Sequence, residues 1–242
     1  MIETLVALVF AHALADFVIQ TSRMASEKNK GRWKALALHA LVVAVLTAAA
    51  IGIYSVVALG TVVAVAVTHL LIDWGKARFD ANVSSFLVDQ MAHLVVLILV
   101  AALCPGLWAS GLLANFQWLP PMMAIAAGLI FAVRAGGFAV GLLMEPWKPI
   151  GDEGLPGAGA TIGTIERFLI FLLALAGELG AIGFLIAAKS VLRFGTVREG
   201  RALSEYVIVG TLASFAWALA CSLATLGVLE VLAPLGFPAL SR

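Results

Sequence analysis

Charged residues are scarce in this chain of 242 residues: Lys and Arg number 15 and Asp and Glu 14, together 12%, against 62% hydrophobic residues. A soluble domain has about a quarter charged and about half apolar residues. The composition therefore excludes a soluble enzyme or a disordered tail and indicates a polytopic membrane protein. The net charge of +1 gives no basic field of the kind that attracts nucleic acid, so no nucleic-acid partner is expected.

Cysteine is also scarce, and the N-terminus has no basic region. Cys104 and Cys221 stand far apart in apolar runs without a CxxC or Cys/His spacing, which is typical of small buried residues rather than a redox pair or a zinc knuckle. Glu3 lies at the start of the chain, and no Lys or Arg precedes Arg23. A secretory signal peptide needs such a positive region, so the first apolar run is predicted to be a retained membrane helix.

What the chain does have is a series of apolar runs. A helix that crosses a membrane needs about 20 such residues, and the pattern predicts an all-α fold, a polytopic transmembrane helical bundle of about six to seven spans. The count is six or seven because the apolar stretch 165–188 is interrupted by Gly177-Glu178-Leu179-Gly180. The other candidate spans are residues 2–21, 35–55, 56–76, 86–108, 120–144 and 206–231.

Basic residues separate the loops into two classes. The first and third loops are basic, whereas the turn near Tyr54 and the segment 105–118 hold no charge. The positive-inside rule then places the first and third loops in the cytoplasm and the N-terminus outside. The basic residues of these two loops are Arg23, Lys28, Lys30, Arg32 and Lys34, then Lys76 and Arg78.

The interrupted stretch at 165–188 has two interpretations. If it crosses once, the loop with Lys189 and Arg193 lies outside, against the charge rule. If it breaks near Gly177 and returns as a re-entrant hairpin, this loop stays cytoplasmic, and such backbone is tolerated at membrane depth when protein surrounds it. The charge rule favours the hairpin.

The chain is accordingly predicted to have two regions. Residues 1–108 form a four-helix transmembrane core, and residues 109–242 form a C-terminal transmembrane region with a Gly/Pro-rich cytoplasmic loop at 145–163. In the second region Arg134 lies within a span and needs a carboxylate, for which Glu178 and Glu145 are the candidates. A re-entrant hairpin would also bring Glu166-Arg167 close to Lys189 and Arg193.

All four histidines lie in the first four spans, and three of them stand four residues from an aspartate. Residues at i and i+4 share one helix face. At 1.5 Å per residue, the set lies about 7 to 16 Å from the basic loops, and therefore at one depth in the cytoplasmic half. The seven residues are His12, Asp16, His39, His69, Asp73, Asp89 and His93.

These seven side chains are predicted to bind one or two divalent metal ions. An ionised carboxylate in hydrocarbon is costly unless it is paired or ligated, and imidazole with carboxylate suits Zn, Mn or Fe. Asp16, Asp73 and Asp89 are the candidate catalytic carboxylates, either as ligands or as groups that orient the histidines. The alternative is that each His/Asp pair is a hydrogen-bonded contact between helices, or part of a proton relay.

A metal at this depth suits hydrolysis, because it lowers the pKa of bound water and polarises a phosphoryl or carbonyl oxygen. The favoured function is a metal-dependent hydrolase of a lipid-linked ester or phosphoester, with a membrane lipid or lipid-linked molecule as the partner. The candidate substrate-binding residues are Gln20, Lys28, Lys76 and Arg78. The same basic residues also serve as a topology signal and as contacts to anionic lipid.

Two other functions stay open at this point. The first is transport of a metal ion or small molecule through the same ligands, although such a site should lie near the midplane and these ligands lie off-centre. The second is a non-catalytic membrane partner in which the His/Asp pairs are structural. The sequence does not fix the oligomeric state.

The His/Asp set forms a spaced sequence pattern. Its parts are His12-Ala13-Leu14-Ala15-Asp16-Phe17-Val18-Ile19-Gln20, Lys28, His39, His69-Leu70-Leu71-Ile72-Asp73 and Asp89-Gln90-Met91-Ala92-His93. This pattern resembles the bacterial membrane-protein family of domain of unknown function 3307. The second half, through residues 163–168, 187–194 and 204–211, resembles the C-terminal extension of some members. The resemblance implies a bacterial inner-membrane protein and assigns no activity. A looser similarity to membrane-bound metal-dependent hydrolases rests on the His/Asp chemistry alone.

Overall fold

The computed structural model describes residues 1–148, 155, 157–193 and 201–232, with side chains for all of these except 190–193 and 201. Within these residues the regular secondary structure is helical throughout. Seven helices are long and apolar enough to cross a membrane. The predicted all-α, multi-span fold is therefore confirmed.

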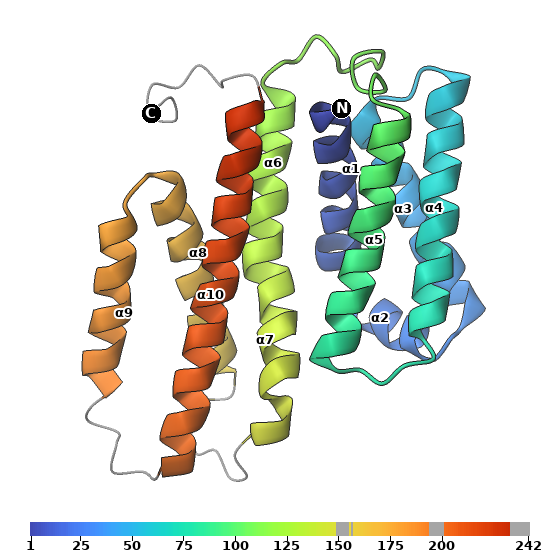
Figure 1. Cartoon of the computed structure of the whole chain (residues 1–242). Coiled ribbons are helices and arrows are strands. Elements are labelled where there is room, and N and C mark those ends of the chain that lie inside the picture. Colours follow the sequence, from blue (N-terminus) through green and yellow to red (C-terminus); the bar gives the residue numbers. More distant parts are fainter. Residues whose placement is uncertain (149–154, 156, 194–200, 233–242) are drawn as a thin grey trace.

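The first half of the chain forms a bundle of four long helices with one short helix at its end (Figure 1). Its elements are α1 (Ile2–Leu14) with the π-helical turn η1 (Ala15–Ile19), α2 (Ser22–Asn29), α3 (Trp33–Ile51), α4 (Val56–Lys76) and α5 (Val83–Leu103). Side chains fix several of the helix starts: Thr21 caps α2, Ser55 caps α4, and Asn82 forms a capping box with Ser85. This box explains why α5 begins three residues before the predicted start at 86.

The second half adds a long helix pair and a helical hairpin. Its elements are α6 (Leu119–Ile130), η2 (Phe131–Ala135), α7 (Gly136–Met144), the 3-10 turn η3 (Glu145–Trp147), α8 (Ala158–Leu175), α9 (Leu179–Arg193) and α10 (Arg201–Val231). α6, η2 and α7 run on as one helix that packs along α1 and α10 (Figure 1).

The stretch predicted to be interrupted is a hairpin. α8 ends at Leu175, Gly177 takes a left-handed φ of 78°, and α9 runs back beside α8. Lys189 Nζ lies 2.6 Å from Glu166 Oε2, so the predicted approach of these two segments is confirmed for this pair. α8 starts at Ala158, inside the segment predicted as loop up to residue 163, and is itself long enough to cross a membrane.

The bundle has one basic end. α2, the 77–82 turn, the end of α7, the end of α9 and the start of α10 all lie at one end, opposite the N-terminus (Figure 1). At the other end, the turn at 52–55 and the segment 104–118 contain no charged residue. The hairpin therefore removes the conflict with the charge rule, because it returns Lys189 to the end that holds the first and third loops.

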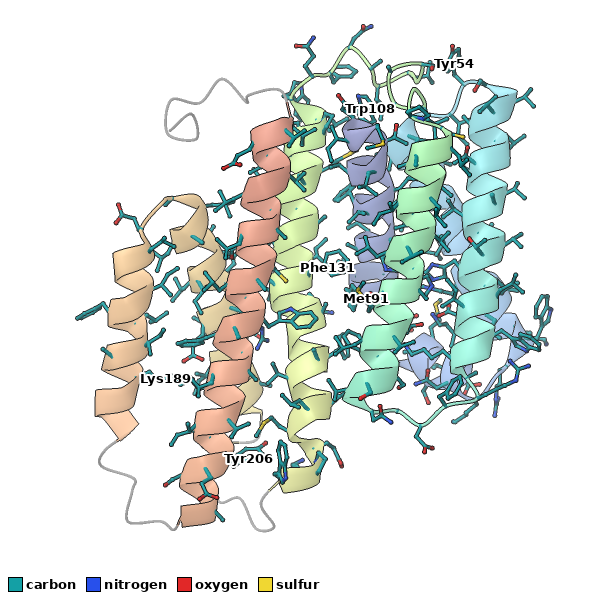
Figure 2. The ribbon with its side chains drawn as sticks, in the orientation of Figure 1. Tyr54, Met91, Trp108, Phe131, Lys189 and Tyr206 are labelled. Atoms are coloured by element: carbon teal, nitrogen blue, oxygen red, sulfur yellow. The ribbon has the colours of Figure 1, made fainter. Side chains whose placement is uncertain are left out.

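The two halves share a core, in which α6 packs on α1. Met123 and Ala124 of α6 join the apolar cluster formed by α1, α3, α4 and α5. About two turns further along, the Phe131 ring lies 5.6 Å from the ring of Phe17 and 6.3 Å from that of His12 (Figure 2). Phe131 thus closes one side of the histidine cluster.

The prediction that Glu145 or Glu178 pairs with Arg134 is wrong. Both glutamates are exposed, and among the described residues no carboxylate lies within 4.0 Å of Arg134. Its Nε instead donates to the carbonyl of Phe17 at 3.1 Å. Phe17 lies in the last turn before the helix ends at Ile19, where carbonyls have no partner within the helix and are available to other donors.

Candidate metal centre

Four helices bring the seven predicted residues into one cluster. His12 and Asp16 come from α1 and η1, His39 from α3, His69 and Asp73 from α4, and Asp89 and His93 from α5. All seven side chains are buried, with at most 8% of each residue exposed. They lie in the half of the bundle next to α2, because α3 and α5 start at that end and α1 and α4 finish there.

Four side-chain atoms form a compact shell at the centre of the cluster. His39 Nε2 lies 3.0 Å from His69 Nε2 and 3.1 Å from Asp16 Oδ1, and His69 Nε2 lies 3.4 Å from the same oxygen. Asp73 Oδ2 lies 3.5 Å from His69 Nε2 and 3.8 Å from His39 Nε2. In a tetrahedral zinc site with bonds of about 2.0 to 2.1 Å, neighbouring ligand atoms lie about 3.3 to 3.4 Å apart. The spacing of this shell fits such an ion.

The other three side chains flank this shell. The His93 ring lies 4.1 Å from the His69 ring and 4.9 Å from the His12 ring. His12 Nδ1 approaches Asp16 Oδ1 at 3.9 Å. Three triplets of potential ligands, each with its ligand atoms within 4.8 Å of one another, overlap in the described part of the chain: His12/Asp16/His69, His39/His69/Asp73 and Asp73/Asp89/His93.

Two lysines neutralise two of the aspartates. Lys28 Nζ lies 2.6 Å from Asp73 Oδ2, and Lys76 Nζ lies 2.6 Å from Asp89 Oδ2. Lys28 comes from α2, which folds back so that the ammonium group is buried inside the bundle. Three carboxylates against two ammonium groups leave the cluster with a formal charge of −1 when the imidazoles are neutral.

Of the remaining predicted substrate-binding residues, Gln20 contacts the cluster and Arg78 lies exposed at the surface. Gln20 follows η1 and donates from Nε2 to the backbone carbonyl of Asp16 at 3.4 Å. Arg78 stacks on the ring of Trp74, with 3.6 Å between Cζ and the ring centroid. A surface pocket of about 220 Å³ opens beside Lys76, lined by Asn29, Lys76, Ala77, Phe79, Asp80, Ala81 and Ser85. Lys76 therefore belongs to both the pocket and the cluster.

Gln90 is a cluster residue that the sequence pattern did not single out. Its Oε1 lies 3.3 Å from His12 Nε2, and its Nε2 donates to Asp89 Oδ2 at 3.0 Å. An amide oxygen only accepts, so His12 carries its proton on Nε2 and leaves Nδ1 free toward Asp16. Gln90 follows Asp89 directly and therefore falls outside the i, i+4 pattern. The only available signal was a polar residue at membrane depth.

The two π-helical turns contact each other beside the centre. η1 contains Asp16, and η2 contains Arg134, which bonds to Phe17 of η1. On its other side, η2 accepts hydrogen bonds from Trp217 Nε1 to Phe131 at 2.9 Å and from Arg167 Nε to Val133 at 3.3 Å. Single π turns are frequent at functional sites. Side chains of the second half thereby support the backbone turn that presents Asp16.

The family model described as a protein of unknown function, DUF3307, matches residues 4–118. The match covers the four helices that supply the cluster and stops before α6, so the resemblance drawn from the His/Asp pattern is confirmed for this part. The similarity drawn for the second half lies outside the matched residues. Neither the curated proteins nor the solved structures contain a significant match to the chain.

Proposed function

We propose that this chain, whose residues 4–118 match the DUF3307 family model, is a membrane-embedded, metal-dependent hydrolase of a lipid-linked ester or phosphoester. The observation that carries the proposal is the shell of Asp16, His39, His69 and Asp73, in which four buried nitrogen and oxygen atoms lie 3.0 to 3.8 Å apart in the contacts given above. The donor types suit Zn, Mn or Fe.

The charge of the cluster supports hydrolysis. A divalent ion changes the formal charge of the cluster from −1 to +1, so that the loaded centre attracts one anion. Hydroxide or a phosphate oxygen would supply that charge as a fifth ligand beside Asp16, His39, His69 and Asp73, and a bound divalent ion makes hydroxide available near neutral pH. The proposed role of the carboxylates is to place the ion: Asp16 and Asp73 would bind it, and Asp89 would lie beside it.

The pocket beside Lys76 is the proposed binding site for the substrate headgroup. It opens at the basic end of the bundle, where Arg78 also lies, and Lys76 connects it to Asp89. Membrane lipids or lipid-linked molecules can reach this end from the bilayer, and phosphate groups are attracted by its charge. We place this end on the cytoplasmic side of a bacterial inner membrane, with the N-terminus outside.

One observation favours a second candidate, in which the cluster is structural. Lys28 and Lys76 already neutralise Asp73 and Asp89 at 2.6 Å, and His39 bonds to Asp16, so several of the buried charges have protein partners. In that case the protein folds without metal, and its function is interaction with another membrane protein. Transport of an ion through the same ligands is a third outcome of the tests below.

Metal content and hydrolysis of the purified protein test the proposal. Wild-type protein in detergent should retain stoichiometric Zn, Mn or Fe and should hydrolyse 4-nitrophenyl esters or phosphoesters, and a chelator should abolish this activity. Asp16→Asn with Asp73→Asn should remove both metal and activity. Glu178→Gln, an exposed carboxylate-to-amide change between α8 and α9 that lies in neither the cluster nor the pocket, serves as the matched control. Folded, metal-free wild type would favour the structural candidate, and metal flux into sealed vesicles without hydrolysis would favour transport.

Cysteine labelling tests the proposed orientation. In a background without Cys104 and Cys221, Asn29→Cys and Ala81→Cys should be protected from an impermeant thiol reagent added to intact cells, and Asn115→Cys should react. All three positions are exposed. Ala81 is preferred to Asn82, because Asn82 caps α5 and its loss costs about 1 kcal/mol. Labelling at 29 and 81 but not at 115 would invert the orientation. Gly200, which would test the hairpin, lies outside the described residues.

A further inference from the structure

The Asp89 and His93 side of the cluster contains buried polar atoms that no protein group satisfies. Among the described residues, His93 Nε2 and Asp89 Oδ1 have no hydrogen-bond partner, although His93 is 3% and Asp89 4% exposed. Buried polar atoms are nearly always bonded in native proteins, so each exception needs an explanation. Neither atom belongs to the four-atom shell of the proposed function.

The hydrogen bonds of His93 leave its second nitrogen ready to bind a metal. His93 Nδ1 lies 2.9 Å from the backbone carbonyl of Asp89, and a carbonyl only accepts, so Nδ1 carries the proton. In a neutral imidazole Nε2 then has a free lone pair. A protonated Nε2 would be a buried N–H donor without an acceptor, which is unfavourable. Histidines that bind metal ions are usually fixed in this way, by a bond from the other ring nitrogen to a carbonyl or carboxylate.

We propose that a second divalent cation binds between Asp89, His93 and Asp73, with Asp73 as the carboxylate shared between the two ions. The proposal rests on the proposed function, since Asp73 also belongs to the first shell. One potential ligand atom from each of the three residues lies within 4.8 Å of the others. Neighbouring ligand atoms of a tetrahedral ion lie about 3.3 to 3.4 Å apart, so the longest distances within the triplet shorten by at most about 1.5 Å when the ion binds.

Without metal, the ammonium group of Lys76 occupies the place beside Asp89 that this cation would take. Its Nζ lies 2.6 Å from Asp89 Oδ2, and its side chain is 29% exposed, in contrast to the Lys28 side chain at 8%. Lys76 also lines the surface pocket, so its ammonium group can move toward solvent when an ion binds to Asp89. Lys28 has no such path and stays with Asp73. Removing the Lys76 charge should therefore favour the second ion, because the ion no longer competes with an ammonium group.

The test is a metal titration of the full-length chain in detergent, first stripped by chelation and then loaded with Mn²⁺. Wild type should bind two ions per chain, and electron paramagnetic resonance should show spin coupling between them. Asp89→Asn and His93→Ala should bind one ion with an uncoupled spectrum. Lys76→Met should bind the second ion about tenfold more tightly than wild type, a size typical of changes around a metal site.

The outcomes separate this proposal from the proposed function. One ion per wild-type chain overturns the second site and leaves the hydrolase centre standing. Two ions that persist in Asp89→Asn and His93→Ala place the second ion elsewhere and overturn the assignment. No bound metal at all overturns both proposals. Thermal unfolding of the stripped variants checks that loss of an ion is not loss of the fold, and Lys76→Met provides the variant whose affinity should rise rather than fall.

Discussion

Replacement of His69 by Ala is expected to lower the affinity for the first metal ion by about 100-fold or more, a larger loss than the 10- to 100-fold typical of residues that only orient a ligand. His69 Nε2 contacts all three other atoms of the shell, at 3.0 Å from His39 Nε2, 3.4 Å from Asp16 Oδ1 and 3.5 Å from Asp73 Oδ2. Alanine removes this donor and leaves a gap at the centre of the cluster. Competition of the purified variant with a chromophoric zinc chelator measures the change.

Two further variants show whether the loss of metal affinity is specific to the four-atom shell. His39→Ala should match His69→Ala, because His39 is as close to Asp16 and is fully buried in the same shell. His39 has no aspartate four residues away in the sequence, yet its Nε2 lies within the shell itself. His12→Ala should be milder, since His12 Nδ1 lies 3.9 Å from Asp16 Oδ1. Equal affinities in wild type, His69→Ala and His39→Ala would leave the four-atom shell without a bound ion.

The depth and helix face of the seven cluster residues were predictable because they follow from helix geometry. Pairs at i and i+4, such as His69 and Asp73, point the same way in any helix, and the distance from a basic loop gives their level. Neither argument needs knowledge of how the helices pack. The sequence could not say which atoms meet at the centre, because that depends on the rotation of each helix about its axis and on the angles at which helices cross.

Contacts that depend on loop geometry and helix ends were harder to predict. Lys28 was predicted to bind substrate with the other basic residues of its loop; α2 folds back and buries it against Asp73. Arg134 was assigned a carboxylate partner, whereas the end of η1 offers it a backbone carbonyl. The last four carbonyls of any helix lack a partner within it, but the sequence does not say which side chain of another helix reaches them. Both contacts depend on how separate segments pack against each other.

Replacing Lys28 by Met is expected to destabilise the metal-free protein by about 3 to 5 kcal/mol, the cost typical of leaving one partner of a buried ion pair uncompensated. Both side chains of the pair are buried, 8% exposed for Lys28 and 3% for Asp73, and their charged atoms lie 2.6 Å apart. Met keeps the length of the side chain, so the effect reports the missing charge. Unfolding of the stripped protein in mixed detergent and dodecyl sulfate micelles measures it.

The double variant Lys28→Met with Asp73→Asn separates charge from packing. If the cost of Lys28→Met comes from the unpaired carboxylate, removing that charge as well should recover most of the lost stability, because an amide of the same size is far easier to bury. Lys30→Met is the matched control: Lys30 is 59% exposed and pairs with Glu27 at 3.5 Å, and such surface pairs contribute at most about 1 kcal/mol.

A divalent ion bound to Asp73 should reduce the cost of Lys28→Met in the same way as the amide does, since the ion supplies the missing positive charge. A Lys28→Met variant as stable as wild type, with or without metal, would show that Lys28 is not the group that keeps Asp73 ionised inside the bundle.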